Sequence, residues 1–328
     1  MGQRFANAEP YVRSYLIHFA CGVLGLALTA LLVGQLVSPP PDTQLVSLRV
    51  QARECEVLFV GPSYVQSQVL TDVVDAEARL LGYPLRTCKF AKTHLKGFEQ
   101  YHSLRILMSQ PWPKLKLVVY DVTLGADSGY VVENRFKPRV IRFHLPEIFQ
   151  WYFRFWSEQK AQRGHPRQLL DHGLHVLARS LHVGVGAELL SAQSVTVSPK
   201  SKRKKGPTLM AEADIRRRLK RLLSMKERAK KTKLPPARRD FIRYEYDLIR
   251  EHGFAAEAIS APVWSLRSLD TTLGQDGPRF SNFADPDKYP SLYTRYAHKR
   301  DDHLTKKGSQ EYSRLLARHL VQRLKSPK

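Results

Sequence analysis

Ser63 lies just after a short apolar run, and its position in the sequence allows two chemical roles. Residues 57–61 read VLFVG, Pro62 comes next, and Ser63 then opens a segment with helical periodicity. Ser63 and Gln66 match the Ser-x-x-Gln capping box, in which the hydroxyl accepts a hydrogen bond from a backbone amide. The same position, at the carboxyl end of a buried strand, is also where open α/β sheets bind ligands and where helix amides stabilise an oxyanion. Ser63 is therefore either a helix cap or a nucleophile.

A nucleophilic serine needs a general base, and the base needs an acid that orients it. A candidate base follows 240 residues later in RDDHLTKKG, where His303 lies just before a helical segment and after Asp301 and Asp302. In an extended chain, residues two apart point to the same side. This spacing favours Asp301 over Asp302 as the orienting acid.

The segments that must position these residues alternate between strand and helix patterns. Short apolar runs predict strands at 57–61, 85–90, 115–122 and 254–264. Apolar stripes predict helices at 64–81, 97–109, 241–252 and 304–324. A strand, helix, strand, helix, strand order with short connections is typical of a doubly wound α/β fold with a mostly parallel sheet.

The N-terminal part of the sequence predicts a membrane anchor. Residues 15–37 contain no Asp, Glu, Lys or Arg over 23 positions, which is enough for a helix across a hydrocarbon core of about 30 Å. Three prolines follow, and two arginines against one glutamate precede the run. The positive-inside bias therefore predicts a cytoplasmic tail at 1–14 and an extracytoplasmic body. A cleaved signal peptide is the alternative, but the run is long and ends without a small-x-small site, which favours an uncleaved anchor.

The basic residues are concentrated in one segment. Of the formal net charge of +23, +13 lies between Lys200 and Asp240. Such a run is most often a solvated face, but it can also bind an anionic polysaccharide or lipid headgroups. No aromatic-interleaved recognition motif accompanies it, so we expect no nucleic-acid partner. The predicted organisation is a tail at 1–14, an anchor at 15–37, a linker at 38–54, and an α/β domain at 55–328 with a basic insertion at about 200–239.

Three cysteines are too few for a disulfide scaffold. Cys21 lies in the predicted anchor. If the first two strands are parallel neighbours, Cys55 and Cys88 lie at opposite ends of the pair, so the pattern does not favour a bridge between them. The sequence contains no metal-ligand cluster and no phosphate-binding loop, and we expect no cofactor.

Three features together resemble the SGNH/GDSL hydrolase superfamily: a Gly-x-Ser after the first strand, a late Asp/His pair followed by Leu-Thr-x-x-Gly, and the α/β alternation between them. The closer likeness is to membrane-anchored members that modify cell-envelope polymers, including alginate-type O-acetyltransferases and the D-alanyl-transfer protein of teichoic acids. In those proteins a segment similar to FADPDKYPSLY at 283–293 precedes the histidine block. The resemblance covers roughly 55–145 and 240–325, and it implies a flavodoxin-like SGNH fold.

The resemblance also implies a role for individual residues. Ser63 would be the nucleophile, His303 its general base and Asp301 the acid that orients the imidazole. The backbone amide of Ser63 would form part of the oxyanion hole. Asn134 and Gly97 are the further oxyanion candidates.

The sequence departs from the family pattern at two of these blocks. Pro62 stands in place of the usual aspartate of Gly-Asp-Ser, and Arg300 in place of the acid of Asp-x-x-His. The resemblance implies a serine esterase or O-acyltransferase that acts on cell-envelope carbohydrate from a bacterial-type plasma membrane, with its C-terminal domain outside the cytoplasm. The alternative is a non-catalytic SGNH-like domain that binds or scaffolds an envelope polymer or assembly, with Ser63 only a cap.

Overall fold

The computed structural model describes most of the elements that the sequence predicts. Its described residues are 14–15, 17–22, 24–25, 28, 43–92, 95, 97–122, 210–229, 236–264, 279–294, 297–298 and 303–326. The chain divides into two compact units, 1–40 with 128–201, and 41–127 with 202–328. The second unit contains the sheet and every helix discussed below.

The predicted anchor at 15–37 falls mostly outside the described residues. Ten of its residues are described, and all ten are helical. Within the described part of the chain, no helix is both long and apolar enough to cross a bilayer.

The sheet has five parallel strands in the order β2-β1-β3-β4-β5. The strands are β1 Val57–Gly61, β2 Thr87–Ala91, β3 Leu117–Asp121, β4 Ala255–Ser260 and β5 Arg279–Asn282. The prediction of an α/β fold with a parallel sheet is therefore confirmed. Because β2 lies on one side of β1 and β3 on the other, the strand order reverses at β1, and ligands of open α/β sheets bind beyond the carboxyl ends of the strands at such a point.

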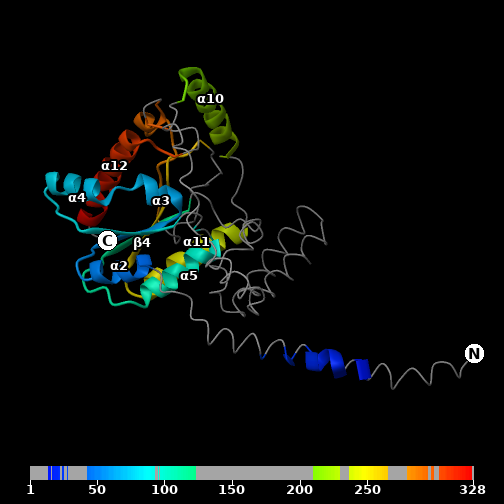
Figure 1. The fold of residues 1–328 in the computed structure, drawn as a ribbon. Helices are drawn as coiled ribbons and strands as arrows, with labels where there is room; N and C mark the ends of the chain where they lie inside the picture. Colours follow the sequence, from blue (N-terminus) through cyan, green and yellow to red (C-terminus); the bar gives the residue numbers. More distant parts are fainter. Residues whose placement is uncertain are drawn as a thin grey trace, which may run out of the picture. The chain divides into compact units, whose positions relative to one another are not determined.

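Helices cover both faces of the sheet (Figure 1). On one face lie α3 Ser63–Gln68, α4 Thr71–Leu80 and α12 Lys306–Lys325. On the other lie α2 Thr43–Gln51, α5 Gly97–Met108 and α11 Pro236–Glu251. Alternate residues of β1 enter the two cores, with Phe59 in the first and Leu58 in the second. All five residues of β1 are buried, which is why this strand reads as a continuous apolar run.

The single helix predicted at 64–81 is two helices in the structure. The backbone of Val69 and Leu70 is extended, with φ −90° and −99°. Side chains from distant segments satisfy the backbone groups freed by the break: Leu70 N donates to Ser313 Oγ at 2.9 Å, and Lys89 Nζ donates to Val69 O at 2.7 Å. The apolar periodicity continues through the break, so the sequence alone did not reveal it.

Three further elements differ from the sequence prediction. Part of the predicted linker at 38–54 forms α2, because Leu48 and Ala52 are buried against the second core. The strand β5 and the 3-10 helix η2, Pro290–Tyr293, were not predicted. The four residues of β5 are exposed or half-buried, so they form no apolar pattern in the sequence. The basic insertion, by contrast, agrees with its sequence: the apolar spacing of Ile215, Leu219 and Leu222 is that of a helix, and the structure contains α10, Glu212–Ala229, there.

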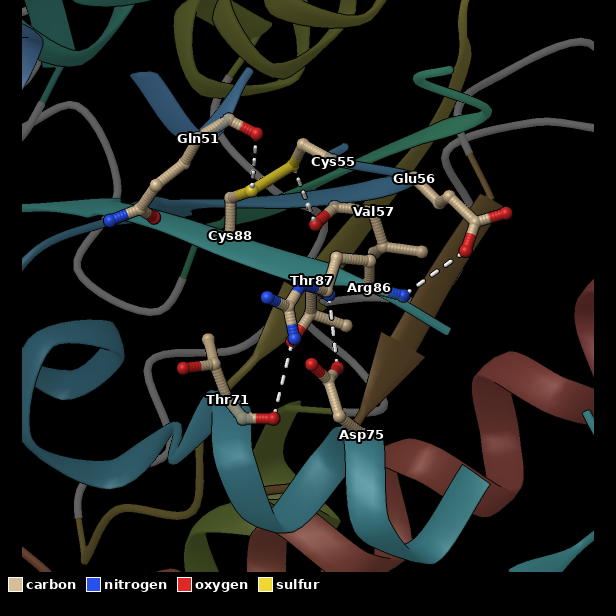
Figure 2. Close-up of a disulfide and its surroundings, with 9 residues drawn as sticks. All are labelled: Gln51, Cys55, Glu56, Val57, Thr71, Asp75, Arg86, Thr87 and Cys88. Carbon is tan, nitrogen blue, oxygen red and sulfur yellow. Dashed lines mark hydrogen bonds between the residues drawn. A yellow bond between two sulfur atoms is a disulfide. The ribbon is translucent and has the colours of Figure 1, made fainter. Parts of the chain in front are cut away.

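Cys55 and Cys88 form a disulfide, which corrects the expectation that they lie apart. The chain bends at Glu56 before β1 begins, so Cys55 turns back over β2 instead of extending the line of the strand. The two Cα atoms are 5.8 Å apart, within the range that a disulfide requires. Figure 2 shows the bridge between Cys55, which precedes β1, and Cys88, the second residue of β2. The strand β2 begins at Thr87, later than predicted, so Cys88 lies near its amino end.

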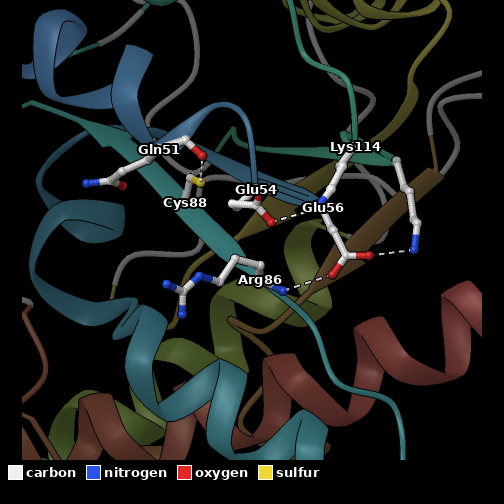
Figure 3. Close-up of polar contacts among 7 residues, drawn as sticks. Gln51, Glu54, Glu56, Arg86, Cys88 and Lys114 are labelled. Atoms are coloured by element: carbon white, nitrogen blue, oxygen red, sulfur yellow. Dashed lines mark hydrogen bonds and ion pairs between the residues drawn. The ribbon is translucent and has the colours of Figure 1, made fainter.

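Hydrogen bonds and ion pairs of charged side chains connect the segments near the disulfide, at the amino ends of the strands (Figure 3). Glu56 accepts from Arg86 N at 3.1 Å and from Lys116 Nζ at 2.6 Å, while Lys114 Nζ donates to Glu54 at 2.6 Å. The lysines are half exposed, so these pairs contribute little stability. Together with the disulfide they align the amino ends of β1, β2 and β3, opposite the edge where ligands bind.

The disulfide should contribute measurably to stability. Replacing both Cys55 and Cys88 with serine should lower the free energy of unfolding by about 2–4 kcal/mol, because the closed loop restricts the unfolded chain. Denaturant unfolding of the detergent-solubilised protein measures this change. Cys21→Ser, which replaces an exposed free cysteine, is the matched control and should leave the value unchanged. An equal loss in the control, or none in the double variant, would contradict the prediction.

Candidate functional site

The structure brings Ser63 and His303 together at the carboxyl end of β1. Ser63 Oγ lies 3.1 Å from His303 Nε2, and both side chains are half-buried. This separation falls within the roughly 2.6–3.2 Å expected between a nucleophile and its base. The two residues come from opposite ends of the domain.

The helix-cap hypothesis for Ser63 is wrong in this structure. Helix α3 begins at Ser63 itself, and Pro62 occupies the N-cap position with φ −76°. Among the described residues, no side chain caps this helix. The hydroxyl of Ser63 instead lies within hydrogen-bond distance of the imidazole of His303. The capping-box pattern in the sequence therefore marks where the helix begins, but the hydrogen bond typical of the box is not formed.

A close approach at Gly61 shapes the corner that carries Ser63. A Cβ added at Gly61 would lie 2.5 Å from Val65 Cγ2 and 2.8 Å from Asp121 Cβ. Only a residue without a side chain lets α3 fold back so tightly over the ends of β1 and β3. The requirement for glycine in the Gly-x-Ser block thus follows from packing.

The segment before α12 positions His303. Thr305 N donates to Ala297 O at 2.7 Å, and the Thr305 hydroxyl caps α12 by accepting from Gly308 N at 3.2 Å. Gly308 packs so closely on the backbone of Ala297 that a Cβ would not fit between them. The Leu-Thr-x-x-Gly motif therefore fixes the start of α12, and with it His303.

Two serines of α12 join this helix to α3. Ser309 Oγ donates to Ser67 O at 3.2 Å, and Ser313 Oγ lies 3.3 Å from Gln68 O. Both serines are buried. The helix that carries Ser63 and the helix that begins just after His303 are therefore held to each other by direct hydrogen bonds.

A second histidine, His298, lies fully buried behind this site. Its ring packs against Trp264 and Tyr293, with centroid distances of 4.7 and 5.3 Å, and its two nitrogens find no hydrogen-bond partner among the described residues. Burial, followed by the positive charges of Arg218 and His303, lowers the pKa of His298 to about 3. Arg218 of α10 therefore lies near enough to the site to act on its electrostatics.

Tyr64 contacts the face of the His303 ring. The two rings are stacked with centroids 5.1 Å apart and an interplanar angle of 27°. The sequence analysis missed this residue, although it immediately follows Ser63.

The structure does not test the other predicted site residues. Asp301 and Asn134 lie outside the described residues. Gly97 is the first residue of α5. Of the predicted site residues, Ser63 and His303 are therefore the pair whose contact the structure describes.

Two buried carboxyl groups at the end of β3 also escaped the sequence analysis. Asp121 is the last residue of the strand, beside Gly61, and Glu245 approaches it from α11. Burial raises the pKa of Glu245 well above its ordinary value; a hydrogen bond from Gln100 opposes this rise, and the negative charge of Asp121 adds to it. Glu245 is consequently held neutral at the edge of the site.

The arrangement contains two of the groups that nucleophilic catalysis uses, a serine hydroxyl and an imidazole. An imidazole nitrogen beside a serine hydroxyl can accept its proton as the oxygen attacks a carbonyl. In the described ranges, no three His, Cys, Asp or Glu side chains lie close enough to hold a metal ion. No protein-family model matches the chain, and no curated protein matches it.

The buried neutral state of His298 should make stability depend on pH. The folded state leaves His298 unprotonated down to about pH 3, whereas the unfolded chain binds the proton near pH 6.5. Between these values the unfolded state binds more protons, so this contribution to stability is complete above about pH 6.5 and is lost as the pH falls.

His298→Phe removes the titrating group and keeps an aromatic ring in the core. Its free energy of unfolding should fall less steeply than that of the wild type below about pH 6.5, by up to about 1.4 kcal/mol per pH unit. Urea unfolding across a pH series measures the difference. Parallel pH profiles for the two proteins would show that His298 is not held neutral by the fold.

Proposed function

We propose that the protein is a membrane-anchored serine esterase or O-acyltransferase that acts on cell-envelope carbohydrate. One observation carries the proposal: Ser63 Oγ and His303 Nε2 lie 3.1 Å apart at the carboxyl end of β1. The strand order reverses at this strand, which is the usual place for a ligand in an open α/β sheet. The fold that we infer is the flavodoxin-like SGNH arrangement.

The proposed reaction has two steps. Ser63 Oγ attacks the carbonyl carbon of an acyl donor while His303 Nε2 accepts the hydroxyl proton, and the donor's leaving group departs with that proton. The acyl group then moves from Ser63 to a carbohydrate hydroxyl or to water, whose proton passes to His303 and returns to the serine oxygen. The product is an O-acylated carbohydrate or a free carboxylic acid, and the enzyme is regenerated.

Further residues have proposed roles in these steps. Asp301 would orient the imidazole of His303 and stabilise its charged form. The oxyanion of the tetrahedral intermediate would be bound by the backbone amide of Ser63, with Asn134 and Gly97 as the other donors. These four assignments derive from the resemblance of the sequence blocks.

The proposed location is the outer side of a bacterial-type plasma membrane. The apolar run at 15–37 supports a single anchor with the N-terminus in the cytoplasm. The disulfide between Cys55 and Cys88 supports an extracytoplasmic domain, because disulfides persist in oxidising compartments and are rare in the cytosol.

A fluorophosphonate probe tests the catalytic proposal. The probe should attach to the peptide that contains GPSYVQ, and Ser63→Ala should abolish both labelling and esterase activity. His303→Ala should reduce labelling severely, on the order of 10²–10⁴-fold, because the hydroxyl loses its base. Intact-protein mass spectrometry measures the adduct, and the unfolding transition shows that each variant remains folded.

The control is Ser67→Ala, which changes an exposed serine one turn further along α3. It should be labelled like the wild type. A well-folded wild-type protein that takes no label would exclude the enzyme and leave the alternative, a non-catalytic domain that scaffolds an envelope polymer.

The basic helix α10 is the proposed binding element for an anionic polysaccharide. Ile215 and Leu222 fix the helix in the same core cluster that contains Tyr64. Arg216 and Arg217 remain about 80% exposed, although each also pairs with an acid one turn earlier, Glu212 and Asp214. Arg218 acts electrostatically on His298. The helix carries more basic than acidic residues and presents them to solvent, where they would attract a negatively charged carbohydrate.

Reversing the charge of α10 should weaken this binding. Arg216→Glu with Arg217→Glu should lower affinity for a soluble anionic polysaccharide, and wild-type binding should decline steeply with added salt. The matched control reverses Arg243 and Arg250, which are exposed on α11 at the other face of the sheet. Equal loss in both double variants would indicate a general charge effect, and binding only to anionic vesicles would assign the helix to lipid headgroups.

A further inference from the structure

We propose that Tyr64 is a positioning residue of the Ser63–His303 site: its ring holds the imidazole against Ser63 and stabilises the imidazolium that forms during proton transfer. The inference rests on the proposed function, because it concerns a step of that reaction. It assigns a role to a residue that neither the motif nor the resemblance identifies.

The contact geometry is that of an aromatic ring beside a potential cation. The ring centroids of Tyr64 and His303 are 5.1 Å apart, with 27° between the planes. A cation within about 6 Å of a ring centroid is attracted to the negative face of the ring. A neutral imidazole gains little from this attraction, so the interaction strengthens when His303 accepts the proton of Ser63. Stabilisation that appears only during the reaction accelerates it.

Consecutive positions on α3 explain how both contacts reach one imidazole. Ser63 and Tyr64 are the first two residues of the helix, and successive helical side chains point about 100° apart. A hydrogen bond to Nε2 lies in the plane of the imidazole, whereas a stacking contact lies on its face. The side chains of Ser63 and Tyr64 must therefore approach the imidazole from directions that are close to perpendicular. Adjacent residues of a helix provide such directions.

The surroundings keep the Tyr64 ring in place. Tyr64 is only 8% exposed and belongs to the first core cluster. The helix start is fixed by Pro62, whose carbonyl accepts from Gln66 N at 3.0 Å. An immobilised ring restricts the rotation of His303 without a loss of entropy at each turnover.

The test compares Tyr64→Leu, which removes the ring, with Tyr64→Phe, which keeps it. The matched control is Tyr83→Leu, the same change at a partly buried tyrosine that packs on the same core cluster. For each full-length protein in detergent, the rate of fluorophosphonate labelling is measured over a range of probe concentrations. This yields a limiting rate and a half-saturating concentration, in the manner of kcat and KM.

We expect Tyr64→Leu to lower the limiting rate by about 2- to 30-fold, the range of a cation–aromatic contact, with an unchanged half-saturating concentration. Tyr64→Phe and Tyr83→Leu should keep the wild-type rate. If Tyr64→Leu lacks the wild-type unfolding transition, Tyr64→Met replaces it in the experiment, because methionine has an adaptable side chain. The same loss of limiting rate is expected for Tyr64→Met.

Three results would overturn the inference. The first is a wild-type limiting rate in Tyr64→Leu. The second is a loss of rate in Tyr64→Phe equal to that in Tyr64→Leu, which would assign the effect to the hydroxyl. The third is a change in the half-saturating concentration alone. A wild-type protein that takes no label would instead reject the proposed function. The two failures are therefore distinguishable in one experiment.

Discussion

The arrangement of the domain depends on the tight corner between β1 and α3. Strand β1 is buried along its whole length, with β2 on one side and β3, β4 and β5 on the other. At its end, Gly61 lets Val65 and Asp121 approach within distances that any side chain would prevent. Because the corner is tight, the hydroxyl of Ser63 is presented at the carboxyl edge of the sheet. The site therefore depends on a steric constraint that the core imposes.

The C-terminal helix completes the site through similar constraints. Gly308 allows α12 to begin directly against the backbone of Ala297, and buried serines join α12 to α3. The serine contacts link segments more than 240 residues apart in the sequence. A change in the packing of α12 would therefore move His303 relative to Ser63, even though α12 itself carries neither reacting atom. In the proposed reaction, preorganisation of this kind would avoid the entropy cost of bringing the two groups together.

Burial separates the protonation behaviour of the groups around the site. His298 is held neutral because its surroundings are apolar and two positive charges act on it. Glu245 is also held neutral, because burial and the nearby Asp121 both disfavour its charge. His303 is half-buried and contacts Ser63 and Tyr64. Among these groups, the half-buried histidine beside the serine is the one placed to exchange a proton during a reaction.

The sequence by itself determined the elements whose signals are local. The apolar run of β1 and the helical stripe of α12 fixed their type and approximate position, and the spacing of Gly-x-Ser and the late histidine identified the two residues that meet. Tertiary structure decided what depends on distant partners: the break at Val69 is stabilised by Lys89 and Ser313, and the disulfide depends on a bend before β1. The contact of Tyr64 with His303 likewise exists only after folding, because its geometry arises from helix packing and leaves no periodic signal in the sequence.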